Sequence, residues 1–350
     1  MTVRRRGGGA KVVSALLAAL LPAGIAFGET PSPASFLALA GSVVRVEADR
    51  ESGALALGTG VTIAPSIVVT NCHVLREATS VRISGLGRLW RVDSESPDIR
   101  HDLCFLRIPG WTGAPVPLGS STRLRPGETV AALGFTGGMG RSLRFGRVVA
   151  LHAFDGADII ESDSAFTSGA SGGGLFDASG TLVGLLTFRK AATGGGYYSL
   201  PAEWIASRIP KEGEWRDLAP LPSAGAFWQS DPDSLPYFMR CATVEAEGRW
   251  GALLELTDRW TVESPRDSEP LRVRGRALQR LNQPQAAVAA YTAALRLAPE
   301  DALAWYGLAL AYAALGDEAA SLKAEATLAS ISEPLAVDLR DRLARPRTTQ

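Results

Sequence analysis

Apolar and polar positions alternate in many short runs between residues 43 and 200, and glycine and proline separate the runs. A period of two is typical of half-buried β-strands, so this pattern predicts an all-β region. We expect two sets of six strands, joined by a connection at residues 110–119. The first set covers residues 42–48, 58–64, 67–70, 81–84, 89–93 and 103–108, and the second covers residues 129–134, 142–151, 158–162, 174–177, 182–188 and 197–200. Two similar six-stranded barrels are implied.

After residue 236 the spacing of apolar residues changes to the 3.6-residue period that is typical of helices. Turn residues and prolines recur there every 34 residues: Gly248, Asn282 and Gly316, and Pro265 and Pro299. A helix–turn–helix unit of 34 residues is the period of tetratricopeptide repeats. An ordinary helical bundle is the alternative, and the shared spacing of the two residue sets favours the repeats.

Composition divides the 350 residues into four parts. A segment rich in proline, serine, glycine and aspartate separates the β-rich region from the helices, and we expect it to be a linker. The expected boundaries are 1–28 for a signal peptide, 34–210 for the β-rich domain, 211–233 for the linker and 234–345 for the helical repeats. The fold class is therefore multidomain, with an all-β double six-stranded barrel followed by an all-α helical-repeat domain.

The N-terminus has the parts of a secretory signal peptide. Basic residues at 4–6 and 11 precede an apolar run at 12–21, and small residues at 26 and 28 suit cleavage. The apolar run is shorter than the roughly 20 residues that a membrane span requires. The 36 basic residues balance the 36 acidic ones, which argues against an obligate nucleic-acid partner. We expect an exported bacterial protein, periplasmic or secreted, without a stable membrane anchor after cleavage.

Three short segments carry a histidine, an aspartate and a serine in that order: His73, Asp102 and Ser171. A serine hydroxyl is a poor nucleophile at neutral pH, so it needs an imidazole to take its proton and a carboxylate to orient that imidazole. Residues 169–173 also fit the G-x-S-x-G elbow of α/β-hydrolases, but that family places its histidine after the serine, and no histidine follows Ser171. A subtilisin order, with Asp49 before His73, would require helices between the strands. The chymotrypsin order is therefore favoured.

The other histidines and aspartates are less suitably placed. His101 and His152 lack the strand-edge setting of a catalytic base, so we expect structural or surface roles for them. Asp93 and Asp98 lie in a polar loop, whereas Asp102 begins an apolar strand in which a buried carboxylate is held rigidly. Asp102 is therefore expected to be the acid of the triad.

Two of the three cysteines flank the expected triad, since Cys72 directly precedes His73. Cys104 lies on the same face of its strand as Asp102, so a contact between that carboxylate and the imidazole would bring the two thiols together. An exported protein can oxidise such a pair, and two buried free thiols are the alternative. Cys241 lies in the helical region and is expected to belong to the core. The sequence has no cluster with metal-ligand spacing, and we expect neither a metal nor a cofactor.

With these motifs placed, residues 42–205 resemble the trypsin-like serine proteases, and among them the bacterial HtrA-type branch. The stretches that match are 58–61, 70–74, 102–106, 134–135, 162–163 and 169–175. The resemblance implies a chymotrypsin-like fold in which Ser171 attacks the scissile carbonyl, His73 acts as base and then as acid, and Asp102 orients the imidazole. It also implies an oxyanion hole at the backbone N–H groups of Gly169 and Ser171, and glycine suits position 169 because it adopts unusual backbone conformations without strain.

The resemblance further implies where substrate binds. Ala165 would lie at the base of the specificity pocket and leave room for a small or medium apolar side chain, and Phe166 would narrow that pocket. The strand that contains Leu186, Thr187 and Phe188 would pair with an extended substrate. In the place of the C-terminal PDZ domains usual in HtrA-type proteins, this chain has the helical repeats.

These expectations describe an exported serine endopeptidase that hydrolyses peptide bonds through an acyl-enzyme. Its partners would be a protein or peptide substrate at the triad, and a substrate or partner protein on the concave face of the repeats. The competing hypothesis is a catalytically silent protein, in which the protease fold is a scaffold and the repeats bind partners.

Overall fold

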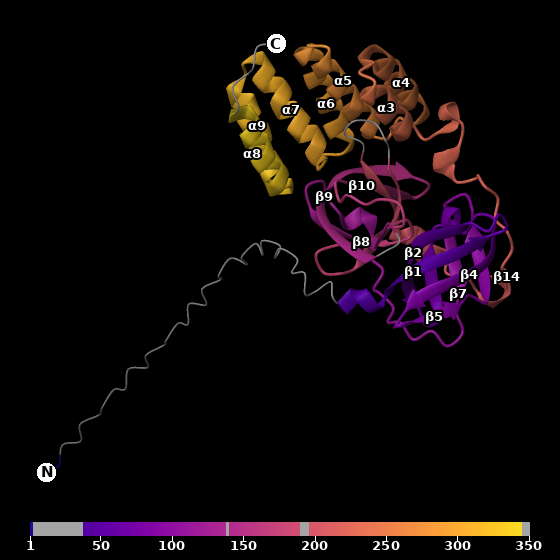
Figure 1. Ribbon diagram of the computed structural model, residues 1–350. Coiled ribbons are helices and arrows are strands. Elements are labelled where there is room, and N and C mark those ends of the chain that lie inside the picture. Colours follow the sequence, from indigo (N-terminus) through magenta and orange to yellow (C-terminus); the bar gives the residue numbers. More distant parts are fainter. Residues whose placement is uncertain (3–37, 138–139, 190–195, 345–350) are drawn as a thin grey trace.

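Two β-rich bodies and one helical body follow one another along the chain (Figure 1). This computed structural model describes residues 1–2, 38–137, 140–189 and 196–344. The expected signal peptide lies outside the described residues, apart from the first two positions. Within the described part of the chain, no helix combines the length and the apolar character that crossing a membrane requires.

Within the described ranges, the first β-rich body is an antiparallel sheet of eight strands in the order β14-β6-β7-β3-β2-β1-β4-β5. Its strands are β1 (Val43–Arg50), β2 (Leu55–Ala64), β3 (Ile67–Thr70), β4 (Ala78–Gly85), β5 (Arg88–Arg91), β6 (Ser94–Asp98), β7 (Leu103–Arg107) and β14 (Arg216–Asp217). β6 and β14 are additional to the predicted strands. β6 contains charged residues and a proline, and β14 comes from the expected linker, so neither shows the alternation that predicted the others. An ion pair of 2.9 Å between Arg216 and the buried Glu95 holds β14 against β6.

The second β-rich body is a closed barrel with the strand order β10-β13-β12-β11-β8-β9. Its strands are β8 (Thr129–Thr136), β9 (Gly140–Phe154), β10 (Ala157–Ser162), β11 (Gly174–Phe176), β12 (Leu182–Arg189) and β13 (Tyr197–Pro201). Each of them overlaps a range predicted from the alternating pattern. The expected multidomain architecture is confirmed. One of the two expected six-stranded barrels is a closed barrel, whereas the other is an eight-stranded sheet in the described part of the chain.

The C-terminal helices follow the 34-residue period. They are α3 (Tyr237–Ala246), α4 (Trp250–Glu263), α5 (Glu269–Arg280), α6 (Pro284–Leu297), α7 (Ala302–Leu315), α8 (Glu318–Ile331) and α9 (Glu333–Ala344), and the short α2 (Ala202–Ser207) precedes them. Gly248, Asn282 and Gly316 lie between the two helices of successive pairs, with φ of 68°, 57° and 77°. This left-handed conformation favours glycine or asparagine and lets the chain reverse after a helix. The recurring turn residues of the sequence are therefore the points at which the helix pairs turn.

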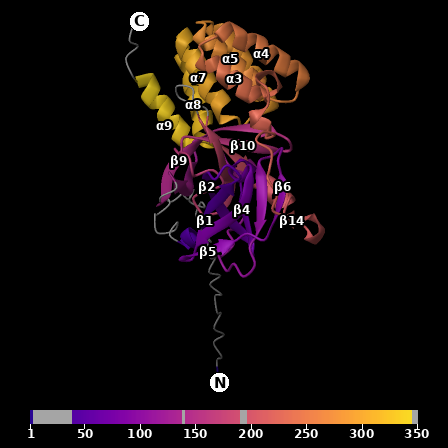
Figure 2. The same ribbon diagram turned by 45° about the vertical axis from the view of Figure 1, so that its right-hand side comes forward.

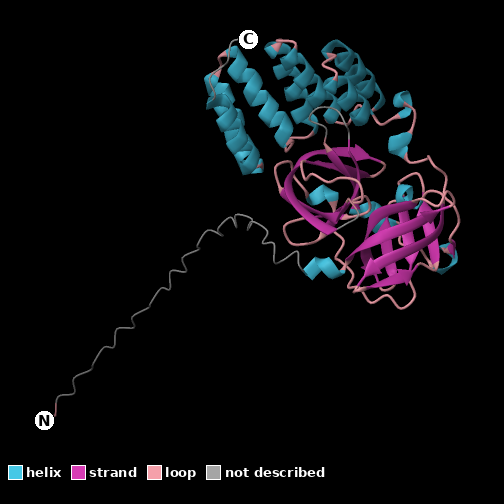
Figure 3. Cartoon of the chain, in the orientation of Figure 1, coloured by secondary structure: helices cyan, strands magenta, loops and turns pink. Residues whose placement is uncertain are grey.

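The helices lie beside β9 and β10 of the barrel, on the side away from the first sheet (Figure 1, Figure 2). Figure 3 shows the same division into two groups of strands and one group of helices. One hydrophobic cluster nevertheless continues through all three bodies, from Val69 and Phe105 in the first sheet through Ile159 and Tyr198 in the barrel to Phe238 in α3. The helical body is thus packed against the barrel.

Tyr291 in α6 packs between two glycines of the neighbouring helices, Gly275 and Gly307. A Cβ on Gly275 would lie 2.7 Å from the Tyr291 ring, and one on Gly307 would lie closer still. We expect Gly307→Val to lower the free energy of unfolding by about 2 kcal/mol, because overpacking forces the ring or the backbone to shift. Gly251→Val is the control, since Gly251 is an exposed helix residue with open space at its Cβ position. Urea unfolding measures both variants, and equal changes would contradict this account of the packing.

Candidate active site

The backbone of each expected triad residue is fixed by a neighbouring strand. His73 lies in the short helix η2 (Cys72–Leu75) directly after β3, and Asp102 immediately precedes β7. β3 and β7 are antiparallel neighbours, so the end of one and the start of the other lie at the same end of the sheet. Ser171 lies in the loop between β10 and β11 of the barrel. The candidate site therefore combines the first sheet with the barrel.

Asp102 holds His73 through both of its carboxylate oxygens. Oδ2 accepts a hydrogen bond from His73 Nδ1 at 2.6 Å, and Oδ1 accepts one from the backbone N–H of His73 at 2.8 Å. Because an ionised carboxylate only accepts hydrogen bonds, Nδ1 carries the proton and Nε2 is left as an acceptor. This is the tautomer that a general base for a serine hydroxyl requires.

The Asp102 backbone has a φ of 56°, in the left-handed region that is uncommon for residues other than glycine. The buried Asn71 fixes it, since its side-chain amide donates to the Asp102 carbonyl oxygen at 3.0 Å and to the Thr187 hydroxyl at 3.1 Å. Strained conformations of this kind persist where the surroundings determine them, and they cluster at functional sites. The strain is thus a second feature that distinguishes Asp102 from the other aspartates considered.

The Ser171 hydroxyl donates to the Thr187 carbonyl oxygen at 3.4 Å. In the described part of the chain, no hydrogen bond joins this hydroxyl to His73. The serine loop is nevertheless packed against the segment before His73, since a Cβ on Gly172 would lie 3.0 Å from the Asn71 backbone nitrogen. Rotation about χ1 redirects a serine hydroxyl on a fast timescale, and catalytic hydrogen bonds are often long before substrate binds.

The expected oxyanion hole is formed by a loop that Thr59 holds in place. Gly169 has a φ of 94°, which glycine adopts without a Cβ penalty. The Thr59 hydroxyl donates to the Gly169 carbonyl oxygen at 2.7 Å, and the Thr59 N–H donates to the Ser171 carbonyl oxygen at 2.8 Å. Among the described residues, the N–H groups of Gly169 and Ser171 have no acceptor. Two backbone donors are therefore available beside the Ser171 hydroxyl.

The two residues expected to line the specificity pocket differ in exposure. Ala165 is exposed, whereas Phe166 is 6% exposed and packs against Tyr197, with ring centroids 5.1 Å apart. The Phe166 ring therefore contributes to the barrel core, and Ala165 presents the small apolar surface.

The strand expected to pair with substrate is β12. Leu186 and Thr187 are buried, and Phe188 is 8% exposed. The ladder between β12 and β13 is irregular between Leu186 and Phe188, so Thr187 lies outside its register. Because the Thr187 carbonyl oxygen accepts the Ser171 hydroxyl, the serine contacts this strand directly.

A disulfide bond joins Cys72 to Cys104 across the site. It links the residue before His73 to β7, next to Asp102. For a sequence separation of 32 residues, a disulfide restricts the unfolded chain enough to add about 4 kcal/mol of stability. Cys241 is a buried free thiol in α3, and burial raises the pKa of this thiol to about 12, which keeps it protonated and unreactive.

The remaining histidines are structural. Each ring pairs with two carboxylates: His101 with Asp98 and Asp155, and His152 with Glu161 and Glu269. Both rings are buried, in agreement with the structural role considered for them. In the described ranges, these two clusters included, no group of three or more His, Cys, Asp or Glu side chains is arranged to hold a metal ion.

Trp228 also contacts the candidate site, and no sequence pattern predicts this contact. It lies in the short helix η5 (Phe227–Gln229), inside the expected linker, and its Nε1–H donates to Asp102 Oδ2 at 3.1 Å. Its ring meets the His73 ring edge-on, with centroids 5.5 Å apart. A tryptophan in a segment without periodicity gives no local sign of a contact with a residue 126 positions away.

Two family models match the chain. Residues 58–185 match the trypsin-like peptidase domain, and residues 272–334 match the tetratricopeptide repeat. The chain carries a trypsin-like peptidase domain and tetratricopeptide repeats. His73, Asp102 and Ser171 all lie within the part that matches the peptidase domain.

Several curated relatives of the chain are proteases by name. The chain is 33% identical over 157 residues to Protease Do-like 1, chloroplastic, from Arabidopsis thaliana, across 41% of this chain and 36% of the relative. It is 30% identical over 163 residues to the periplasmic serine endoprotease DegP from Escherichia coli (strain K12), across 43% of this chain and 34% of the relative. The chain thus spans about a third of the length of these relatives.

Solved structures also align with about half of the chain. The HtrA-type protease AlgW with tripeptide has 26% sequence identity and a TM-score of 0.47, and the alignment covers 52% of this chain and 65% of that chain. The Rv3671c protease from M. tuberculosis in its active form has 21% identity and a TM-score of 0.49, with 56% of this chain and 92% of that chain covered.

Proposed function

We propose that this chain is an exported serine endopeptidase that uses His73, Asp102 and Ser171. The observation that carries the proposal is the pair of hydrogen bonds between His73 and Asp102, at 2.6 and 2.8 Å. The serine loop beside them has two backbone N–H groups without an acceptor among the described residues. The match of residues 58–185 to the trypsin-like peptidase domain supports it. Export is supported by the composition of the N-terminus and by the periplasmic location in the name of DegP.

In the proposed reaction, His73 Nε2 takes the Ser171 Oγ proton as that oxygen attacks the carbonyl carbon of the scissile peptide bond. The N–H groups of Gly169 and Ser171 stabilise the oxyanion that forms. The His73 imidazolium then gives its proton to the leaving amine, the C–N bond breaks, and an acyl-enzyme remains. Water activated by His73 hydrolyses the acyl-enzyme and releases the carboxylate product.

The same site suggests the substrate class. Ala165 is exposed and uncharged, which favours a small or medium apolar side chain at the cleaved residue, with Phe166 limiting the depth of the pocket. The substrate backbone would lie extended along Leu186, Thr187 and Phe188, where the β12 ladder is irregular.

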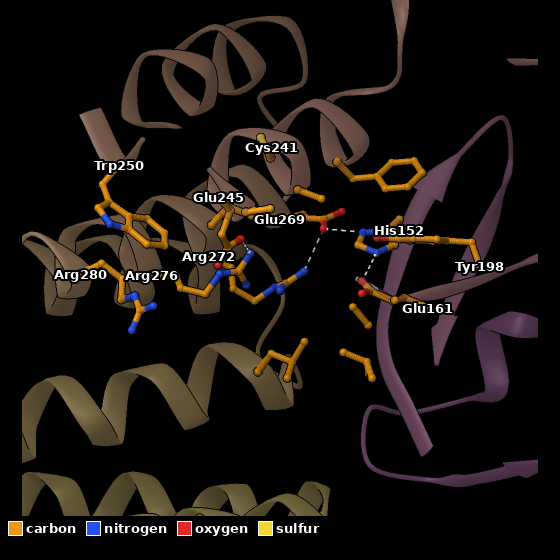
Figure 4. A pocket seen from close by; sticks show the side chains of 18 residues that line it. His152, Glu161, Tyr198, Cys241, Glu245, Trp250, Glu269, Arg272, Arg276 and Arg280 are labelled. Atoms are coloured by element: carbon orange, nitrogen blue, oxygen red, sulfur yellow. Dashed lines mark hydrogen bonds and ion pairs between the residues drawn. The ribbon is translucent and has the colours of Figure 1, made fainter. Parts of the chain in front are cut away.

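The helical repeats are proposed to bind a substrate or partner protein. A cavity of about 620 Å³ lies along α5 and α7, and its lining includes the following arginines: Arg272, Arg276, Arg280 and Arg342. Figure 4 shows the adjoining cavity at the barrel, where Arg280 stacks on Trp250 at 4.9 Å from the ring centroid. These hollowed surfaces of stacked helices support a docking role.

Labelling with a fluorophosphonate probe tests the peptidase proposal, because such probes react with activated serines. We expect the wild-type chain to be labelled, and Ser171→Ala to lose labelling and peptide hydrolysis by roughly 10³-fold or more. Ser168→Ala is the matched control, since Ser168 is an exposed serine of the same loop. Ser168→Ala should keep both the probe labelling and the peptide hydrolysis of the wild-type chain.

One observation favours a second candidate, a catalytically silent scaffold that acts through its repeats. The Ser171 hydroxyl is bonded to the Thr187 carbonyl oxygen rather than to His73. If the protein is such a scaffold, the fluorophosphonate probe will not label the wild-type chain, either alone or with added partner extracts. Labelling that depends on Ser171 rules out the scaffold.

A further inference from the structure

We propose that Trp228 is a positioning residue of the candidate active site, through which residues 211–236 hold the pair of Asp102 and His73. The inference rests on the proposed peptidase function and adds to it a residue outside the range that matches the peptidase domain. Trp228 acts on the carboxylate and the imidazole, so its role is to orient them.

Trp228 contacts both members of the pair. Its Nε1–H donates at 3.1 Å to Asp102 Oδ2, the same oxygen that accepts the His73 Nδ1 proton at 2.6 Å. Its ring meets the His73 ring at 86° and stacks on Phe188 at 18°, with centroids 5.5 and 5.2 Å apart. Phe188 belongs to β12, the strand that carries the Ser171 acceptor. The indole is therefore fixed between this strand and the imidazole, with its N–H directed at the carboxylate.

Asp102 needs this donor because the nearby Thr187 hydroxyl is engaged elsewhere. Thr187 Oγ1 donates to the Leu185 carbonyl oxygen at 2.8 Å and accepts from Asn71 Nδ2 at 3.1 Å. Asp102 is 1% exposed, so water contributes little to its solvation. A buried carboxylate is stable only when its oxygens are well hydrogen-bonded. The Asp102 carboxylate thus accepts three hydrogen bonds. Two come from the backbone N–H and Nδ1–H of His73, and the third comes from Trp228.

The segment around Trp228 is anchored to the first sheet. Leu221 forms a bridge with Arg76, three residues after His73 in the sequence. Phe227 is 7% exposed, and its N–H donates to the carbonyl oxygen of residue 100 at 3.0 Å. These contacts hold the backbone on both sides of residues 222–226 and fix the direction of the indole.

The same segment leads into the first repeat helix. Only the short helix η6 (Pro232–Ser234) lies between Trp228 and α3 among the described elements. At the start of α3, Phe238 stacks on His152 of the barrel at 15°, with centroids 4.3 Å apart. Residues 229–237 therefore connect Trp228 to the contact between the barrel and the repeats.

Trp228→Phe tests the inference, because phenylalanine keeps an aromatic ring and loses the N–H donor. We expect kcat for a peptide substrate to fall roughly tenfold while KM changes less than about twofold, since a hydrogen bond to a charged group is lost and the substrate surface is kept. Trp215→Phe is the matched control: Trp215 lies in the same segment and stacks with Arg107, 4.3 Å from its ring centroid. It should keep the wild-type kcat, and equal losses in both variants overturn the inference.

A second readout separates this inference from the peptidase proposal. In chains that also carry Ser171→Ala, proton NMR follows the low-field resonance of His73 Nδ1–H. We expect Trp228→Phe to shift or abolish this resonance and Trp215→Phe to leave it unchanged. If the resonance responds in this way while the wild-type chain hydrolyses no peptide, the peptidase proposal fails and the positioning role stands. An unchanged resonance, or a rise in kcat for Trp228→Phe, overturns the positioning role.

Discussion

Asp102→Asn is expected to lower kcat by roughly 10⁴-fold with little change in KM. Both carboxylate oxygens accept N–H groups of His73, at 2.6 and 2.8 Å, so an amide nitrogen at either position would face another donor. The imidazole then favours the tautomer with the proton on Nε2, which is unable to accept the proton of Ser171. Steady-state hydrolysis of a peptide substrate measures the loss.

The control for this variant is Asp93→Asn. Asp93 is an exposed aspartate of the loop that the sequence offers as an alternative acid. It should retain wild-type kcat. A large loss in Asp93→Asn, or a wild-type rate in Asp102→Asn, would contradict the assignment of the acid. Circular dichroism of both variants checks that the sheet and the barrel remain folded.

The parts of the fold that the sequence predicts are those with a strong local pattern. The barrel strands β8 to β13 are short runs rich in apolar residues, and the helix pairs turn at residues that recur every 34 positions. The candidate triad residues are recognisable for the same reason, since each stands beside such a strand. β14 is not predictable, because two residues show no period and their pairing with β6 depends on the distant Glu95.

The finer geometry of the candidate site depends on long-range contacts that no motif encodes. The serine motif does not determine the direction of the Ser171 hydroxyl, which follows from its rotamer and the Thr187 carbonyl. The composition of residues 211–236 indicates a linker, yet Trp228 in that segment bonds to Asp102. Proline and glycine describe the local backbone of such a segment and give no information about what its aromatic side chains contact.

His152 is the clearest case of a residue whose role depends on a distant partner. Nδ1 pairs with Glu269 Oε1 of α5 at 2.7 Å, and Nε2 pairs with Glu161 Oε2 of β10 at 3.0 Å. Figure 4 shows this imidazole between the two carboxylates, where the barrel meets the repeats. Glu269 also pairs with Arg272 at 3.1 Å. The ring thus joins the peptidase domain to the helical repeats through a buried ion pair.

The protonation of His152 makes this junction sensitive to pH. Burial favours the neutral ring, but the charges and hydrogen bonds of Glu269 and Glu161 outweigh it and raise the pKa of His152 from 6.5 to about 9. A raised pKa in the folded state contributes stability that is fully present below the unfolded value of 6.5. That contribution is lost as the pH rises through about 9. The junction should therefore weaken in alkaline solution.

Glu269→Gln is expected to lower the free energy of unfolding at neutral pH by about 3 kcal/mol, because the buried His152 and Arg272 each lose one of their two carboxylate partners. The exposed ion pair between Arg125 and Glu300, 3.3 Å apart, also joins the barrel to the repeats and supplies the control. Glu300→Gln should cost less than about 1 kcal/mol, since water screens exposed pairs. Denaturant unfolding measured at pH values from 6.5 to above 9 should show a steeper loss for the wild-type chain than for Glu269→Gln. Equal costs for the two variants, or parallel pH profiles, would place the stability of the junction in the apolar contacts around Phe238 rather than in this ion pair.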